Sequence, residues 1–219
     1  MDPIKSSFKN LLVLIYGYSA AAMLAGLCLF LKFTVRVSHV GRPENFYQRA
    51  FIECSWHENL LPYFVGTMPY TKAYVWMNHP AWYMKGIHLF LTWMGVRKLV
   101  LGSSGHGGQM ALIQLAPMLN NEVSTFLNPD GPHGPSHKVK NGVLQLSLLS
   151  GLPVVAIRVT CSSALRFPTW DRKVFPLPGS LITLEYSAPM YVTTASLEQV
   201  REQIALHLNG CTSHSLPSA

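Results

Sequence analysis

Charged side chains are scarce in this chain of 219 residues. Asp, Glu, Lys and Arg together make up 12% of it, whereas hydrophobic residues make up 49%. A typical soluble domain carries about 25% charged residues. The length suits one domain of ordinary size plus an appendage. We therefore expect that part of the chain lies in lipid, or that its surface is unusually apolar.

Paired cysteines and basic runs are also missing. The cysteines are Cys28, Cys54, Cys161 and Cys211, and no two of them form a C-x-x-C pair. Neither a disulfide framework nor a zinc knuckle is expected from this pattern. The net charge is +7, but no run of Lys and Arg stands out. We therefore expect no nucleic-acid partner, whereas an anionic membrane surface or an acidic substrate suits the charge.

One long hydrophobic run is present near the N-terminus. Leu11 to Leu31 contains no charged residue, and at about 1.5 Å per residue a helix of this length spans roughly 30 Å, the thickness of a bilayer core. A cleaved signal peptide is the rival interpretation, but its apolar region is shorter and ends at a cleavage site. We predict a retained anchor over residues 1–34, either single-pass or lying in the interface. The basic residues that follow favour a cytoplasmic main domain.

Beyond residue 34, apolar runs of strand length alternate with amphipathic stretches of helix length. The expected strands are Val35–Val40, Phe51–Trp56, Ala73–Met77, Lys98–Leu101, Val123–Leu127, Val154–Val159 and Ser180–Tyr186. The expected helices are Glu58–Val65, Ala81–Met94, Gly107–Leu119, Lys140–Ser150 and Ser196–Leu208. This alternation predicts an α/β domain over residues 35–219, with a central mixed, largely parallel sheet flanked by helices.

Residues capable of chemistry gather where expected strands meet expected helices. Ligands of open α/β sheets bind beyond the carboxyl ends of the strands, so we expect these joints to line one cleft. The joints are Ser55–Glu58, Asn78–Pro80, Gly102–Gly108 and Asn128–Pro135. Their histidines lack the spacing of a zinc-binding helix and no cysteine supports them, so no metal site is expected.

Two of these joints offer a general base. His57 and His79 each follow an apolar strand, and an imidazole titrates close to neutrality, which suits proton transfer. Each histidine also has a structural interpretation, as a residue that caps or packs at a helix start. Asp130 lies among prolines and glycines, and such a rigid loop is typical of a carboxylate that must be held in place.

The glycine-rich joint predicts an anion site. Residues 102–108 hold four glycines, two serines and one histidine before an expected helix. Exposed N–H groups at such a turn bind anions, helped by the helix dipole. The spacing fits neither a Walker loop, a dinucleotide fingerprint nor a serine-hydrolase elbow. We expect Gly102, Ser103 and Ser104 to contact substrate.

Taken in order, these motifs resemble a bacterial branch of the lysophospholipid acyltransferase-like superfamily, which has the glycerophosphate acyltransferase fold. The matching motifs are Trp56-His57, Leu101-Gly102-Ser103-Ser104, Pro129–Pro135, Gly151–Val155, Trp170-Asp171-Arg172 and Pro176-Leu177-Pro178. The resemblance runs from about Phe51 to Val192, and its most specific part is the Pro-Asp-Gly-Pro block followed by Trp-Asp-Arg.

This resemblance implies acyl transfer from acyl-CoA or acyl carrier protein to a hydroxyl of a lysophospholipid or related membrane lipid, without a further cofactor. In the superfamily a histidine takes the proton of the acceptor hydroxyl, and an aspartate five residues later orients the imidazole. A second block binds the acceptor's phosphate, and Asp130–His133 occupies its place here. The implied substrate-binding residues are Gly102, Ser103, Ser104, Gly131, His133 and Lys138.

The chain departs from the superfamily's histidine motif. Five positions after His57 lies Pro62, and five after His79 lies Met84, so neither histidine has its aspartate. The order of motifs favours His57 as the base, whereas the dipeptide Asn78-His79, which matches the common Asn-His start of the motif, favours His79. The carboxylates near the motifs are Glu53, Glu58, Asp130 and Asp171, and we expect Asp130 to be the partner.

Two arginines of the branch are also replaced, by Leu101 and His133. Lys138, Lys140 or Arg97 is expected to compensate for their charge. The missing aspartate leaves open a non-catalytic, lipid-binding relative of the fold. A hydrolase that uses Ser103 or Ser104 is a third hypothesis.

Overall fold

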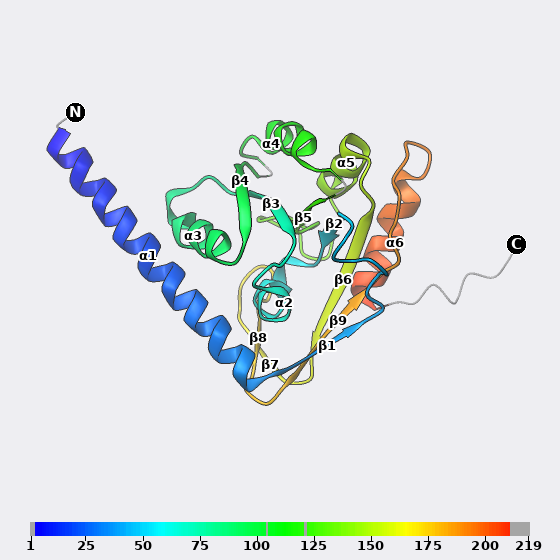
Figure 1. Ribbon diagram of the computed structural model, residues 1–219, viewed down its shortest axis with the longest axis horizontal. Coiled ribbons are helices and arrows are strands. Elements are labelled where there is room, and N and C mark those ends of the chain that lie inside the picture. Colours follow the sequence, from blue (N-terminus) through cyan, green and yellow to red (C-terminus); the bar gives the residue numbers. More distant parts are fainter. Residues whose placement is uncertain (1–2, 104, 121, 211–219) are drawn as a thin grey trace, which may run out of the picture.

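A mixed seven-stranded sheet forms the centre of the protein (Figure 1). The computed structural model describes residues 3–103, 105–120 and 122–210. The strand order is β1-β9-β6-β2-β5-β3-β4, and every neighbouring pair is parallel except β6 and β9. The strands are β1 (Arg36–Val40), β2 (Ile52–Cys54), β3 (Ala73–Asn78), β4 (Val96–Leu101), β5 (Val123–Leu127), β6 (Val154–Cys161) and β9 (Leu181–Tyr186). The expected α/β class, with a mixed, largely parallel sheet, is confirmed.

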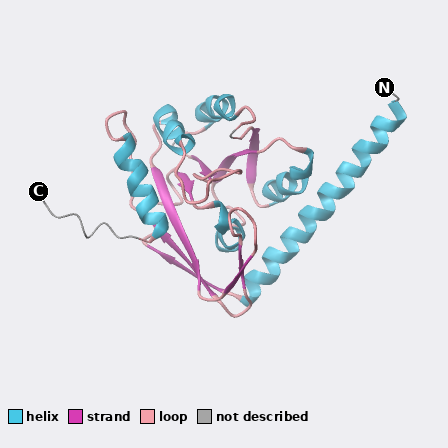
Figure 2. Ribbon diagram, turned by 180° about the vertical axis from the view of Figure 1, so that it is seen from behind, coloured by secondary structure: helices cyan, strands magenta, loops and turns pink. Residues whose placement is uncertain are grey.

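Helices cover both faces of the sheet (Figures 1 and 2). One face carries α1 (Pro3–Thr34), α2 (Leu60–Thr67) and α3 (Lys85–Trp93). The other carries α4 (Gly108–Leu115), α5 (Asn141–Ser150) and α6 (Leu197–Asn209). Short 3₁₀ turns lie at His57–Asn59, Trp82–Met84 and Ala116–Met118. Central strands are therefore buried on both sides, which explains the unbroken apolar run of Val154–Ile157.

A small second ribbon was not predicted. β7 (Ala164–Arg166) and β8 (Val174–Pro176) pair antiparallel, outside the main sheet. Each strand is three residues long, which is too short for an alternating pattern to show. The loop between them, residues 167–173, reaches back to the end of β2.

The N-terminal helix is long and apolar enough to cross a membrane. Its stretch Asn10–Thr34 has a mean hydropathy of 2.0, and 17% of its most apolar window is buried. One side of α1 packs along α3 (Figure 1), where a Cβ on Gly86 would lie 2.6 Å from the Cβ of Ala20. Tyr16 Oη also donates to the carbonyl of Tyr83, at 2.9 Å. The helix is therefore fastened to the domain along one side, and most side chains of Asn10–Thr34 are not buried.

Replacing Gly86 with leucine is expected to separate α1 from α3. The added side chain meets Ala20 on a facing helix, and overpacking of this kind costs about 1–3 kcal/mol of unfolding free energy. Gly26→Leu is the matched control, because a Cβ there meets no atom within 4 Å. Thermal unfolding in detergent, followed by circular dichroism, compares the two. Equal stability of both variants would contradict the described packing.

Candidate active site

One large cavity opens at the carboxyl edge of β2, β3, β4 and β5. Its volume is about 480 Å³. Polar side chains reach it from the joints after these strands, among them His57, His79, Ser103, His133 and Lys140, and Lys173 reaches it from the loop between β7 and β8. Apolar side chains, among them Leu24, Leu61, Phe64, Ile87 and Phe126, come from α1, α2, α3 and β5. The joints thus lie together where open α/β sheets place their ligands.

His57 is paired with a carboxylate. Its Nδ1 lies 2.5 Å from Oδ2 of Asp171, which is fully buried, whereas the His57 side chain is 19% exposed. The ring of Trp170 stacks on the imidazole, with centroids 5.3 Å apart. Because an ionised carboxylate only accepts hydrogen bonds, Nδ1 must carry the proton. Nε2 is then the unprotonated nitrogen, which is the form a general base requires.

Asp171 is held by its own loop. Thr169 Oγ1 donates to Oδ1 at 2.6 Å, and Lys173 Nζ donates to Oδ2 at 2.6 Å. Burial favours a raised pKa for Asp171, but hydrogen bonds from Lys173, Thr169 and His57 outweigh it and bring the pKa to about 2. The carboxylate is therefore ionised at neutral pH and can orient the imidazole.

The imidazole of His57 is kept neutral. Its burial and then the charge of Lys173 lower its pKa, and together they outweigh the hydrogen bond and charge of Asp171, which raise it. The pKa of His57 therefore lies below the ordinary histidine value. A base must be unprotonated before it can take a proton, so this environment favours the reactive form at neutral pH.

Glu58 fastens two loops beside His57. Arg166 Nη1 on β7 lies 3.1 Å from Oε2, and His137 Nε2 lies 3.3 Å from Oε1. The β7–β8 ribbon and the loop after β5 are therefore both anchored to the residue that follows the base candidate. This position explains why Glu58 is not a partner of the His57 ring.

The structure corrects the expected role of Asp130. This residue is fully buried, and its Oδ1 accepts the backbone N–H of His57 at 3.1 Å. Among the described residues, Oδ2 has no hydrogen-bond partner. Asp130 therefore holds the backbone, and the carboxylate that contacts the imidazole is Asp171.

Asp130 is also the less acidic of the two aspartates. Burial raises its pKa to about 6, against backbone N–H groups of His57, Asp130 and His137 that lower it. A group held partly protonated near neutrality is a poor permanent charge for a neighbouring imidazole.

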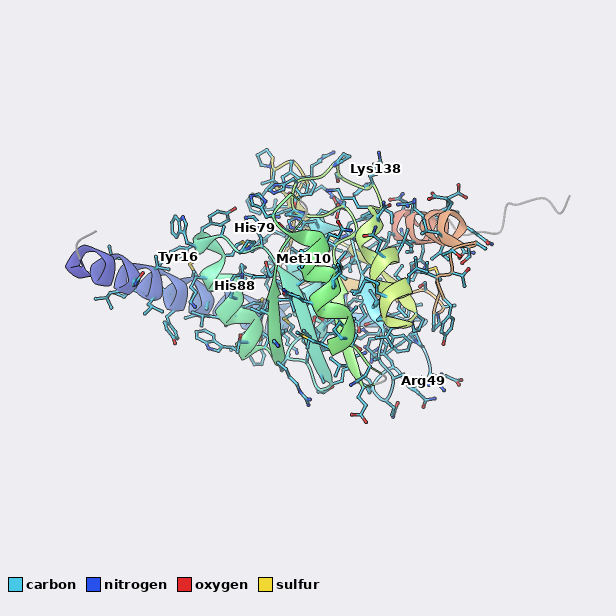
Figure 3. All side chains as sticks on the ribbon, turned by 90° about the horizontal axis from the view of Figure 1, so that it is seen from above. Tyr16, Arg49, His79, His88, Met110 and Lys138 are labelled. Carbon is cyan, nitrogen blue, oxygen red and sulfur yellow. The ribbon has the colours of Figure 1, made fainter. Side chains whose placement is uncertain are left out.

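His79 belongs to a separate polar cluster at the cavity. Its Nδ1 lies 2.8 Å from Ser103 Oγ, and its ring centroid lies 4.8 Å from that of His106 and 6.1 Å from that of His133. Desolvation, followed by the charges of His106 and His133, lowers the pKa of His79. Figure 3 shows His79 between α3 and α4. In the described part of the chain its ring contacts a hydroxyl and no carboxylate.

The glycine-rich turn uses some of its own N–H groups. Gly102 N–H donates to the carbonyl of Asn78 at 2.8 Å, and Ser103 N–H donates to that of His106 at 3.1 Å. Gly102 is required because a Cβ there would lie 2.4 Å from the Cβ of Ala111. The turn therefore presents the side chain of Ser103 to the cavity. Ser104 lies outside the described residues.

Of the remaining residues that were expected to bind substrate, some line the cavity and one does not. Gly131 and His133 line the cavity, as does Lys140. Lys138 does not line it: its side chain is exposed and points outward (Figure 3). Lys140 therefore takes the place expected for Lys138. Among the residues that the structure describes, no group of three or more potential ligands is arranged to hold a metal ion.

Sequence reasoning missed Lys173 and did not choose Asp171. The Trp170-Asp171-Arg172 block was a recognisable signal, and Asp171 was among the four candidate carboxylates. Its partner His57 lies 114 positions earlier, however, and no local pattern connects the two. Lys173 carried no motif of its own.

Comparison with known proteins gives similarity without a family. No family model matches the chain. The uncharacterized protein RP090 of Rickettsia prowazekii (strain Madrid E) is 24% identical over 112 residues, which are 51% of this chain and 48% of that protein. The chain therefore matches about half the length of this curated relative.

A solved structure is similar over a longer stretch. The crystal structure of the 1-acyl-sn-glycerophosphate (LPA) acyltransferase PlsC from Thermotoga maritima has a TM-score of 0.49 and 19% sequence identity. The match covers 94% of this chain and 99% of that chain. The chemistry of the cavity is therefore inferred from the side chains that line it.

The raised pKa of Asp130 makes stability depend on pH. The folded chain holds this proton up to about pH 6, whereas an unfolded aspartate releases it near pH 4. The folded state then binds more protons, so Asp130 lowers stability as the pH rises from about 4 to 6. Two pKa units correspond to roughly 3 kcal/mol. Asp130→Asn is expected to gain stability relative to wild type over this range, measured by urea unfolding.

Asp171→Asn is the control of opposite sign. The pKa of Asp171 is lowered to about 2, so its contribution is present above pH 4 and is lost as the pH falls toward 2. This variant should therefore be less stable than wild type at neutral pH, with a deficit that shrinks in acid. If the free energy of unfolding changed with pH in the same way in wild type and in both variants, these assignments would be contradicted.

Proposed function

We propose that this protein is a membrane-bound O-acyltransferase that moves an acyl chain from acyl-CoA or acyl carrier protein to a hydroxyl of a lysophospholipid or related lipid. One observation carries the proposal. A neutral imidazole, oriented by a buried ionised carboxylate, faces a cavity whose other walls are apolar. Asp171 supplies, from 114 positions away, the carboxylate that the superfamily places five residues after its histidine.

The proposed reaction needs one base and one leaving group. His57 Nε2 takes the proton of the acceptor hydroxyl while the oxygen attacks the thioester carbonyl. The new C–O bond forms, the C–S bond breaks, and the leaving thiolate takes the proton from the imidazolium. Asp171 stabilises that imidazolium without itself being protonated. No other group has to accept or supply a proton.

The apolar part of the cavity favours a lipid substrate. Phe64 and Phe126 line it from α2 and β5, and Leu24 lines it from α1. The wall is thus built partly by the helix that is long and apolar enough to cross a membrane. A hydrocarbon chain buries apolar surface there at a gain of about 25 cal/mol per Å². A small polar substrate would leave these walls unmatched.

The polar part of the cavity favours an anionic acceptor. His79, His133, Lys140 and Lys173 line it. Two carboxylates near it are already paired with cations, Asp171 with Lys173 and Glu58 with Arg166. Imidazole and ammonium groups donate hydrogen bonds to phosphate oxygens. A lipid that carries a phosphate beside its free hydroxyl therefore suits this end.

A hydrolase is the second candidate. The hydrogen bond between His79 Nδ1 and Ser103 Oγ is the observation that favours it, because a serine beside an imidazole is an activated nucleophile. No carboxylate orients His79 within the described residues, so the His57 arrangement is the stronger one.

Substitution at His57 is expected to stop transfer. His57→Gln should lower kcat by about 10²–10⁴, the usual contribution of a general base, and Asp171→Asn should lower it comparably because the ring adopts the wrong tautomer. His79→Gln and Ser103→Ala should instead act mainly on KM for a lysophosphatidic acceptor. Release of free thiol from acyl-CoA by purified protein in lipid–detergent micelles measures all four.

The same assay separates the rivals. Loss of turnover in Ser103→Ala, together with thiol release that needs no acceptor, would favour the hydrolase. Wild-type protein that releases no thiol from either acyl-CoA or acyl carrier protein, with any phosphate-bearing acceptor, would favour a non-catalytic lipid-binding protein.

A further inference from the structure

We infer that Lys173 is a positioning residue of this site: its ammonium lies against both Asp171 and His57 and opposes protonation of the imidazole. Its Nζ is 2.6 Å from Asp171 Oδ2 and 3.3 Å from His57 Nδ1. The same carboxylate oxygen contacts the ring at 2.5 Å. Three functional groups therefore meet at one point, and two of them compete to donate to one oxygen.

The backbone holds Lys173 at this point. Its N–H donates to Thr169 Oγ1 at 3.1 Å, and its carbonyl accepts the N–H of Phe167 at 3.0 Å. The next residue, Val174, is buried. Thr169 also bonds to Asp171, so one threonine fixes the positions of both the carboxylate and the lysine. The loop thus fixes the backbone of Lys173 beside His57 and Asp171, and the contacts of Nζ with Asp171 Oδ2 and His57 Nδ1 locate the ammonium.

The charges around the ring determine what Lys173 does. The groups that face His57 are Asp171 and Lys173 from the β7–β8 loop, Asp130 and His133 from the loop after β5, and the adjacent Glu58. Glu58 is paired with Arg166, and Asp130 contacts the backbone of His57. Lys173 therefore supplies the contacting positive charge. Protonating the ring would place two cations 3.3 Å apart.

In the proposed reaction, on which the kinetic part of this inference rests, Lys173 makes the His57 imidazolium a stronger acid. The proton taken from the acceptor hydroxyl arrives on Nε2 of a ring that already has a cation at Nδ1. An imidazolium beside a cation is more acidic than one without it, so it passes its proton readily to the departing thiolate. The resting ring stays neutral and is ready as a base. A lysine that served only as a surface ion pair would leave the titration of the ring unchanged.

The experiment titrates the His57 ring by NMR in protein with ¹⁵N-labelled histidine. The signal is assigned by its loss in His57→Gln. Lys173→Met should raise the midpoint by about one pH unit, because a like charge in contact is removed. Lys173→Arg keeps the charge and should stay close to wild type. Arg172→Met is the matched control, since it removes a positive charge from the same loop but no contact with His57 or Asp171.

A second readout is the acidic limb of kcat/KM, whose midpoint should move upward by the same amount in Lys173→Met. Lys173→Gln replaces Lys173→Met if that variant does not fold. An unmoved or lowered midpoint in the uncharged variant that folds overturns the inference, as does an equal shift in Arg172→Met. The NMR shift needs no substrate. A shift without acyl transfer rejects the proposed function alone, whereas transfer with an unmoved midpoint rejects the role of Lys173 alone.

Discussion

The hydrogen bond between His57 Nδ1 and Asp171 Oδ2 joins the end of β2 to a loop outside the main sheet. The chemistry of the cavity depends on it. Without this bond the imidazole has no fixed tautomer, and the buried carboxylate loses one of its partners. The ion pair of Arg166 with Glu58 holds the ribbon in place beside the ring. The main sheet thus positions His57, and the two-stranded ribbon supplies its carboxylate partner Asp171.

The sheet supplies the rest of the geometry. Its parallel strands end at one edge, so residues that follow β2, β3, β4 and β5 meet there although they are far apart in the chain. Helices on both faces bury the strands and leave the edge open. On one side of the opening, α1 adds an apolar wall. Polar chemistry and a lipid-compatible surface are thus placed side by side by ordinary α/β packing.

Local pattern predicted most of the sheet and little of the pairing at its edge. The strand at Val123–Leu127 matches its expected bounds, because a short apolar run between turn residues carries its own signal. β7 and β8 are too short to carry one. Asp130 has a stronger local motif than Asp171, yet its carboxylate faces the backbone. Likewise Lys138 and Lys140 stand two positions apart on an aperiodic loop, and only tertiary structure decides which one faces the cavity.

The pairing of His57 with Asp171 is tested most directly by the proton on Nδ1. A proton held between an imidazole and a carboxylate exchanges slowly with water and resonates far downfield in the ¹H NMR spectrum. The structure predicts one such resonance that is lost in His57→Gln and in Asp171→Asn but is kept in Asp130→Asn. A resonance that survives in Asp171→Asn and disappears in Asp130→Asn would contradict the account.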